Sequence, residues 1–183
     1  MTSLRVGVIM GSDSDLATMR HVGRALGAVG LRATVDYEER VVSAHRTPRA
    51  MAAYAAEAAG RGLQVIVAGA GGSAHLPGMV ASETTLPVLG VAVTSSPDTL
   101  NRALGSMIGM PEGKPLATFQ GPAGAYNAGL FAARVLALAD PGLAAALAAL
   151  DRQLADSVAA RDRRLAELGS EAYLADPPPT PGS

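Results

Sequence analysis

Short apolar runs alternate along the chain with longer segments in which apolar residues recur every three or four positions. The short runs are typical of strands buried on both faces of a parallel sheet, and the longer segments are typical of amphipathic helices. The pattern predicts strands at 5–10, 33–42, 64–68, 88–93 and 116–119. It predicts helices at 16–29, 48–59, shortly after a loop at 69–78, at 97–107 and at 125–139.

This alternation predicts an α/β fold. Because right-handed crossovers permit little else, we expect an open parallel sheet with helices on both faces, a three-layer αβα sandwich. If its five strands follow the flavodoxin-like order 2-1-3-4-5, the loops after the first three strands are neighbours at one edge of the sheet. Each loop precedes a helix, so backbone N–H groups and positive helix ends point at one pocket, which we expect to bind phosphate.

The end of the chain differs from this pattern. Asp140-Pro141 is expected to begin a long C-terminal helix at about 141–168 with a narrow apolar seam. Two arrangements are open: the helix packs against another subunit, or it lies on its own domain. We expect one catalytic domain at 1–170 and a disordered Pro-rich tail at 174–183. The seam consists of Leu143, Leu147, Leu150, Leu154, Val158, Leu165 and Leu168.

Composition and charge limit the kinds of partner that the protein can bind. The 183 residues include 15 basic and 16 acidic side chains, so there is no basic field for nucleic acid or an anionic membrane. No segment has the length of a membrane span, and we expect no signal peptide. The absence of cysteine excludes disulfides and thiolate catalysis and is compatible with a reducing cytoplasm. Because the overall charge does not attract anions, any bound anion must be held by the local geometry of its site.

The first loop, 11–15, offers hydroxyls and carboxylates. Ser12 and Ser14 could donate to a phosphate, and Asp13 and Asp15 could accept from a sugar diol. The same residues are also common helix caps and turn formers. Asp13 and Asp15 resemble a metal pair only weakly, because no further carboxylate or histidine clusters with them.

The second loop, Ser43-Ala-His-Arg-Thr-Pro48, combines a hydroxyl, an imidazole and a guanidinium where an extended segment turns into a helix. Arg46 can bind a phosphate with two parallel hydrogen bonds, and Ser43 can donate to the same group. Histidine exchanges a proton near neutral pH, so His45 is a candidate acid and base. The alternative is a loop histidine that only bonds a carbonyl. Thr47-Pro48 predicts the start of the helix.

The third loop matches G-x-G-x-x-[GA] at 69–74, but a nucleotide dehydrogenase is disfavoured. The motif follows the third strand instead of the first, and the next strand ends in Val93-Thr94-Ser95 without an acid. No G-x-S-x-G motif supports a serine hydrolase. We interpret the glycines as a backbone that must approach a flat ligand closely. His75 either contacts that ligand or opens the next helix.

Together these motifs resemble the N5-carboxyaminoimidazole ribonucleotide mutases of purine biosynthesis, over about residues 6–139. Several long motifs in one order are more specific than any single motif. They are Gly11-Ser-Asp-Ser-Asp15, Val41-Val-Ser-Ala-His-Arg-Thr-Pro48, Ala68-Gly-Ala-Gly-Gly-Ser-Ala-His-Leu-Pro-Gly-Met79, Thr85-Leu-Pro-Val-Leu-Gly-Val91 and Asn127-Ala-Gly-Leu130.

The resemblance implies an enzyme that moves a carboxylate from the exocyclic nitrogen to ring carbon C4 through bound CO2, with no metal, nucleotide cofactor or ATP. His45 would be the acid and then the base. The resemblance also implies a cytoplasmic flavodoxin-like homo-octamer whose C-terminal helices cross to neighbours. Substrate contacts are implied for Ser12, Ser14, Asp15, Ser43, Ala44, Arg46, Ala70, Gly71, Ser73, His75 and Leu76.

The sequence departs from the family pattern in three places. The segment 34–41 is slightly longer, Ser73 stands where alanine is common, and Gly121-Pro122-Ala123-Gly124 replaces Gly-Lys-Ala-Gly at the expected far rim of the pocket. The combination of His45-Arg46 with Gly72-Ser-Ala-His75 favours the mutase over relatives that carboxylate with CO2. Two alternatives remain: a CO2-dependent carboxylase of aminoimidazole ribonucleotide or a pyridine nucleotide, and a non-catalytic nucleotide-binding sensor.

Overall fold

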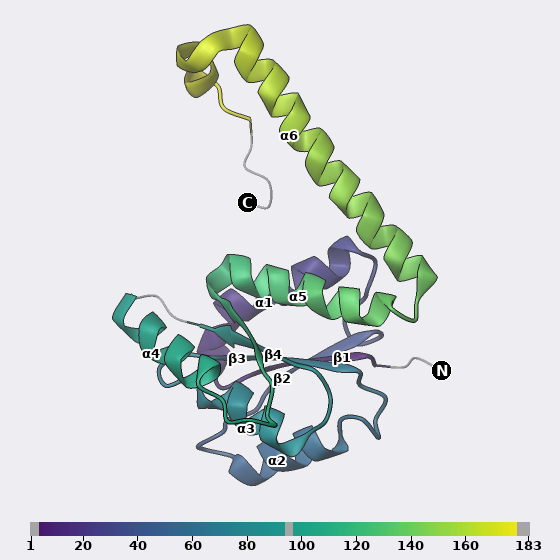
Figure 1. Ribbon diagram of the computed structural model, residues 1–183, viewed down its shortest axis with the longest axis vertical. Helices are drawn as coiled ribbons and strands as arrows, with labels where there is room; N and C mark the ends of the chain where they lie inside the picture. The colour runs from purple at the N-terminus through teal and green to yellow at the C-terminus, as the bar shows by residue number, and fades with distance from the viewer. Residues whose placement is uncertain (1–3, 94–96, 179–183) are drawn as a thin grey trace.

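The computed structural model describes residues 4–93 and 97–178, and it forms an open five-stranded parallel sheet (Figure 1). The strand order is β2-β1-β3-β4-β5, which confirms the predicted flavodoxin-like arrangement. The strands are β1 (Val6–Met10), β2 (Tyr37–Val41), β3 (Val65–Ala70), β4 (Val88–Ala92) and β5 (Ala117–Gln120). The helices are α1 (Leu16–Ala28), α2 (Pro48–Glu57), α3 (His75–Glu83), α4 (Pro97–Ile108), α5 (Gly121–Ala137) and α6 (Pro141–Ala175), with a 3-10 turn at Asp13–Asp15.

Helices cover both faces of the sheet, as expected of three layers. Alternate side chains of a strand point to opposite faces, so Val6 and Val8 of β1 pack toward α1 and α5, whereas Ile9 packs toward α2 and α3. All three side chains are fully buried. Figure 1 shows α1 and α5 on one side of the sheet and α2 and α3 on the other.

Several element boundaries differ from the prediction. The second strand begins at Tyr37 instead of 33, because the N–H of Asp36 bonds the carbonyl of Arg32 (2.8 Å) and Thr34 has a φ of 61°. This turn uses the backbone groups that a strand would need. Helix α5 begins four residues before the predicted 125, and the predicted loop 69–78 is shortened by strand at one end and helix at the other. Thr94 and Ser95 lie outside the described residues.

A polar cluster fastens α2 to the edge strand β2. The hydroxyl of Tyr54 donates to Oε1 of Glu38 (2.9 Å), and the guanidinium of Arg61 lies 2.8 Å from the same oxygen. Burial and the Glu38 charge raise the pKa of Tyr54, so the phenol stays protonated as the donor. The cluster fixes the helix whose first turn follows the second predicted loop.

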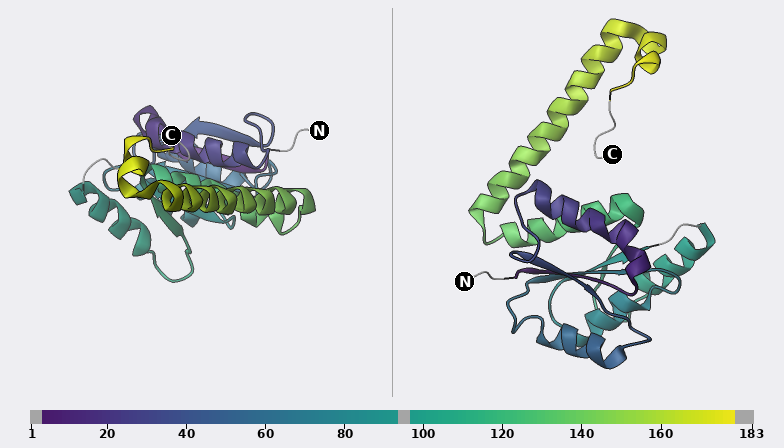
Figure 2. Two further views of the ribbon diagram at one scale, coloured as in Figure 1. Left: turned by 90° about the horizontal axis from the view of Figure 1, so that it is seen from above. Right: turned by 180° about the vertical axis from the view of Figure 1, so that it is seen from behind.

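Helix α6 leaves the sandwich after its first turns. Asp140 caps it by accepting the N–H of Leu143 (3.0 Å), and its carboxylate pairs with Arg5 (2.8 Å). These two hydrogen bonds hold the pKa of Asp140 below its usual value. Only Leu143 and Leu147 of the seam are buried. Figures 1 and 2 show the rest of the helix running away from the domain, on the side of α1 and α5.

The outer part of the seam is therefore exposed, and α6 lies on its own domain only near its root. Leu154, Leu165 and Leu168 are each more than 40% exposed, and Val158 is 67% exposed. The helix breaks at Gly169 (φ 70°, ψ 168°), close to the predicted end at 168, and a further helical turn continues to Ala175. The first two residues of the predicted tail are thus helical, and 179–183 lie outside the described residues.

The close contact between α1 and α5 gives a stability test at Gly129. A Cβ atom there would lie 2.7 Å from the carbonyl oxygen of Val22 and 2.8 Å from the Cβ of Ala25. We expect Gly129→Ala to lower the free energy of unfolding by about 1–3 kcal/mol, because the helices must separate. Gly27→Ala is the matched control: it lies in α1, the partner helix, with nothing within 4 Å of the added atom, and it should be neutral or stabilising. Urea unfolding of both variants measures this, and an equal effect of the two substitutions would contradict the packing argument.

Candidate active site

The three predicted loops meet at the carboxyl edge of the sheet. Met10, the last residue of β1, is in register with Val41 of β2 and with Gly69 of β3. The N–H of Val42 bonds the carbonyl of Met10 (2.8 Å), and the N–H of Gly11 bonds that of Gly69 (3.2 Å). The loops that follow β1, β2 and β3 therefore begin next to one another at this edge of the sheet.

The first loop is a capping box that holds a carboxylate. The backbone N–H of Ser12 donates to Oδ2 of Asp15 (3.1 Å), and the hydroxyls of Ser12 and Ser14 are 3.0 Å apart. Asp15 is only 9% exposed. Burial raises the pKa of its carboxyl, although the Ser12 and Gly11 N–H groups and the Arg46 charge act in the opposite direction. A carboxylate kept in this environment is available to accept hydrogen bonds from a ligand.

The second loop is a tight turn that places Arg46 across the first loop. The N–H of Thr47 bonds the carbonyl of Ser43 (3.0 Å), and the N–H of Arg46 bonds Oγ of Ser43 (3.1 Å). The guanidinium of Arg46 donates to the carbonyl of Gly11 (3.0 Å). Thr47 precedes the first residue of α2 as predicted, but its hydroxyl bonds back to Ser43 and does not cap the helix.

The third loop depends on small residues. A Cβ atom at Gly71 would lie 2.7 Å from the carbonyl oxygen of Val93, so a larger residue would push the loop away from the end of β4. Ala74, which is buried, has φ 46° and ψ 40°, a left-handed conformation, directly before α3. The hydroxyl of Ser106 on α4 donates to the carbonyl of Ser73 (2.5 Å). The loop is thus fixed from its far side.

His45 and His75 join the second and third loops. Nε2 of His45 lies 3.0 Å from Nδ1 of His75, and the two rings meet edge to face at 86° with centroids 5.1 Å apart. From the sequence, His75 was expected either to contact the ligand or to begin the next helix. The structure makes it the first residue of α3 and brings its ring to the candidate acid and base.

These loops enclose a cavity of about 520 Å³. Every predicted site residue lines it except Ser73, which is exposed and bonded through its carbonyl to Ser106. Gly11 and Ala74 also line it; both belong to the predicted loops but were not among the predicted contacts. Ser14 and Asp15 are shared with an adjoining cavity of about 420 Å³ that reaches Thr99. The residues of the main cavity are Gly11, Ser12, Ser14, Asp15, Ser43, Ala44, His45, Arg46, Ala70, Gly71, Ala74, His75 and Leu76.

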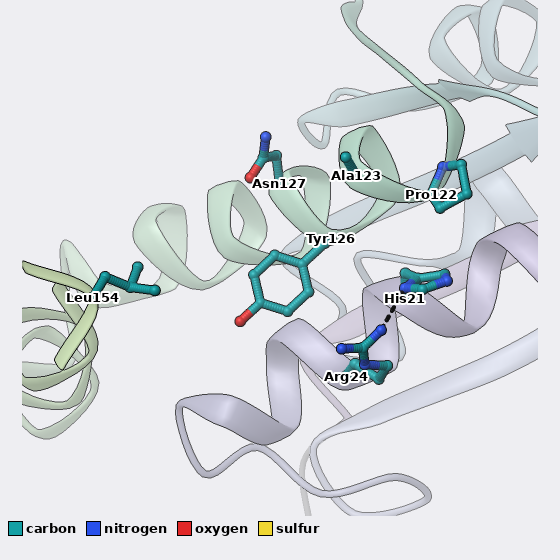
Figure 3. A pocket seen from close by; sticks show the side chains of 7 residues that line it. All are labelled: His21, Arg24, Pro122, Ala123, Tyr126, Asn127 and Leu154. Carbon is teal, nitrogen blue, oxygen red and sulfur yellow. Dashed lines mark hydrogen bonds between the residues drawn. The ribbon is translucent and has the colours of Figure 1, made fainter. Parts of the chain in front are cut away.

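A separate cavity of about 420 Å³ lies between α1, α5 and α6 (Figure 3). Arg24 bonds Nδ1 of His21 across 2.9 Å, and burial followed by the charge of Arg24 lowers the pKa of His21. The ring is therefore neutral and accepts this hydrogen bond. Pro122, expected at the far rim of the active pocket, lines this second cavity instead, together with Leu154 of α6.

The described residues contain no group of three or more histidines and acids placed to hold a metal ion. None of the helices in that part of the chain has both the length and the apolar character needed to cross a membrane.

A parallel sheet of this order, with a polar glycine-rich pocket at its carboxyl edge, defines a flavodoxin-like α/β protein. The chain belongs to the AIR carboxylase family, whose model matches residues 5–157.

Relatives named N5-carboxyaminoimidazole ribonucleotide mutase match over most of the chain. The protein of Mycobacterium tuberculosis is 55% identical over 144 residues, 78% of this chain and 79% of that protein. The protein of Vibrio cholerae is 52% identical over 139 residues (75% and 84%), and that of Thermotoga maritima is 46% identical over 172 residues (93% and 96%). The crystal structure of Treponema denticola PurE has a TM-score of 0.76 at 25% identity, covering 87% of this chain and 97% of the other.

The raised pKa of Asp15 gives a test of how its carboxylate affects the stability of the fold. A carboxyl whose folded-state pKa is raised stabilises the fold only while protonated, and this contribution is lost as the pH rises through the folded-state pKa. Asp15→Asn should therefore raise Tm at pH 7 by about 2–4 °C, the shift that about 1 kcal/mol gives in a chain of this length. The difference should close as the pH falls toward 3.8, the usual value for the group. Thermal melts across pH check this, and a lower Tm of the variant at pH 7 would contradict it.

Proposed function

We propose that this protein is an N5-carboxyaminoimidazole ribonucleotide mutase, which forms 4-carboxy-5-aminoimidazole ribonucleotide in the de novo synthesis of purines. The observation that carries the proposal is one cavity in which an imidazole, a guanidinium and a buried carboxylate lie on three interlinked loops. The family match and the mutase relatives near 50% identity support the substrate.

The site divides between the two ends of a nucleotide. Arg46 and Ser43 bind the phosphate, with the Ser12 hydroxyl beside them, because charge-assisted hydrogen bonds and free N–H groups suit that group. Asp15 accepts from the ribose, near Ser14. The backbone of Ala70 and Gly71, with Ala44, His75 and Leu76, surrounds the base. Ser73 reaches this end only through its loop, since its side chain lies outside the cavity wall.

The reaction needs two proton transfers, one to N5 and one from C4. When the bond between N5 and the carboxylate carbon breaks, the electron pair stays on N5, which takes a proton from the His45 imidazolium. The CO2 is held by N–H donors of the third loop until C4 of the ring attacks it. Neutral His45 then removes the C4 proton, which restores the imidazolium. No electrons are exchanged with a cofactor, and the acid is regenerated in each turnover.

The two alternatives predict different behaviour. A carboxylase of aminoimidazole ribonucleotide, or of a pyridine nucleotide, would need added bicarbonate or CO2. A nucleotide sensor would need the phosphate and ribose contacts but no proton donor, so it would be indifferent to His45. The mutase relatives disfavour the carboxylase, and the placement of His45 in the cavity disfavours the sensor.

The proposal extends to assembly and place in the cell. The protein works in the cytoplasm as a homo-octamer, in which the exposed seam of α6 packs on neighbouring chains. The support is physical: an apolar stripe from Leu154 to Leu168 stands clear of its own domain, and large exposed apolar patches mark interaction sites. The stripe begins beside the cavity that Leu154 shares with α1 and α5, which offers adjoining apolar surface.

Activity is tested by following N5-carboxyaminoimidazole ribonucleotide without ATP or bicarbonate. Wild type should convert it to the C4-carboxylated product, and His45→Asn should lower kcat by at least about a hundredfold, the range for losing general acid and base catalysis. In a second assay the substrate carries a ¹³C-labelled carboxylate and unlabelled bicarbonate is added. The label should stay in the product, because CO2 does not leave the site. Arg49→Gln, on the exposed side of α2 away from the cavity lining, serves as the control.

Two outcomes would contradict these statements separately. No conversion by wild type would overturn the function itself. Equal rates for wild type and His45→Asn would leave the function standing and overturn the role of His45.

Assembly is tested by placing charges on the seam. Leu154→Asp combined with Val158→Asp should convert an octamer to smaller species, because losing two buried apolar contacts costs about 3 kcal/mol or more per helix, more than a hundredfold in association. Leu174→Asp lies beyond the break at Gly169, is more exposed than either seam residue, and should leave the mass unchanged. Sedimentation velocity or light scattering measures the mass, and a monomeric wild type would contradict the proposal.

A further inference from the structure

We propose that His75 is a positioning residue for His45: its Nδ1 accepts the Nε2–H of His45, so that Nδ1 of His45 is the nitrogen that exchanges the proton with substrate. The catalytic part of this inference rests on the proposed function, whereas the hydrogen bond itself can be tested without turnover. His75 would then be a partner of the acid and base in addition to a ligand contact.

The contact has the geometry of a hydrogen bond between rings. Nε2 of His45 and Nδ1 of His75 are 3.0 Å apart, and the rings meet nearly at right angles. At this distance one nitrogen must carry the hydrogen and the other must offer a lone pair, since two N–H groups would repel. The pair therefore fixes the tautomer of each ring relative to the other.

The surroundings favour His45 as the donor. His75 is the first residue of α3, where the unpaired N–H groups and the helix dipole make the environment positive. A lone pair is favoured at this end of a helix, so His75 is the better placed of the two rings to accept the hydrogen bond. Throughout residues 4–93 and 97–178, Nε2 is the only nitrogen of His45 with a hydrogen bond. The ring lines the cavity, and Nδ1 is the nitrogen that the contact with His75 leaves available to a ligand there.

Both rings stand on braced backbone. His45 lies inside the turn closed by hydrogen bonds between Ser43 and Thr47. His75 follows buried Ala74 in its left-handed conformation, and the carbonyl of Ser73 is held by Ser106. Exposed side chains on mobile segments seldom keep one geometry, but here each ring starts from a fixed backbone. The pairing is thus determined by the fold of the two loops.

The consequence for the reaction is that a single nitrogen serves both halves. Nδ1–H of the His45 imidazolium donates to N5 as the CO2 departs, while Nε2–H remains on His75. The lone pair left on Nδ1 then accepts the C4 proton. Because His75 keeps hold of Nε2, the ring has no need to rotate or to exchange tautomers between the two steps.

The tautomer can be observed directly, because the chain has only three histidines. With ¹⁵N-labelled histidine at mildly alkaline pH, NMR of the free protein should show His45 as the Nε2–H tautomer. His45→Asn assigns its signals. His75→Leu should convert them to a mixture of tautomers, whereas His75→Asn should preserve them, since the amide oxygen of asparagine can occupy the place of Nδ1. His21→Leu, which alters the separate cavity, is the control and should leave the His45 signals unchanged.

Kinetics provide the second readout. We expect His75→Leu to lower kcat by about ten- to a hundredfold with a small change in KM, the range for losing one hydrogen bond to a charged group. His75→Asn should recover most of that loss, and His21→Leu should match wild type. Circular dichroism melts of each variant establish that it is folded.

Three results would overturn the inference. The first is a His45 tautomer that is unchanged in His75→Leu. The second is a kcat equal to wild type in that variant. The third is an effect on KM alone, shared by the leucine and asparagine variants, which would make His75 only a ligand contact. A wild type without mutase activity would be recognised by its lack of turnover, and the NMR result would still decide whether the pair forms.

Discussion

The register of β1 between β2 and β3 is the constraint on which the rest of the site depends. Because Met10 pairs with both Val41 and Gly69, the loops after β2 and β3 each begin one strand spacing from the loop after β1. Two side chains then link these loops: Arg46 bonds the carbonyl of Gly11, and His45 bonds His75. A slip of one residue in either pairing would turn the side chains at the strand ends to the opposite face and separate these groups.

The sequence allowed the sheet order and most of the pocket to be predicted, because apolar runs mark buried strands and the motifs fall at their ends. Its failures have local causes. The stretch before Tyr37 is rich in strand-forming residues, yet a turn between Arg32 and Asp36 takes its hydrogen bonds. The fifth helix was predicted from 125, but it begins at Gly121, because a proline such as Pro122 is compatible with the first turn of a helix. The motif placed Ser73 at the ligand, but its contact with Ser106 depends on α4, which is distant in sequence.

The groups of the site differ in burial and therefore in how they affect the stability of the fold. Asp15 is buried, and keeping its charge works against stability, as its raised pKa indicates. Arg46 and the two histidines are exposed, so the charge of Arg46 remains hydrated and the positions of all three side chains depend on the hydrogen bonds between loops. Such a division suits a site that must bind a dianionic phosphate from water and also keep one carboxylate in place for a diol. The glycine and alanine positions allow the backbone to serve as the third wall.

The exposure of these rings links the chemistry to the assembly. Holding CO2 between two steps requires that water be excluded, yet in a single chain His45, His75 and Arg46 all remain open to solvent. In the proposed mechanism the bound nucleotide covers part of the cavity, and the remainder has to be closed by protein. Helix α6 does not serve its own pocket, because it departs on the side of α1 and α5 and the residues of its outer seam are exposed. If the pocket is closed by protein, the cover therefore comes from elsewhere, and a neighbouring chain brought close by that seam is the source that the architecture offers.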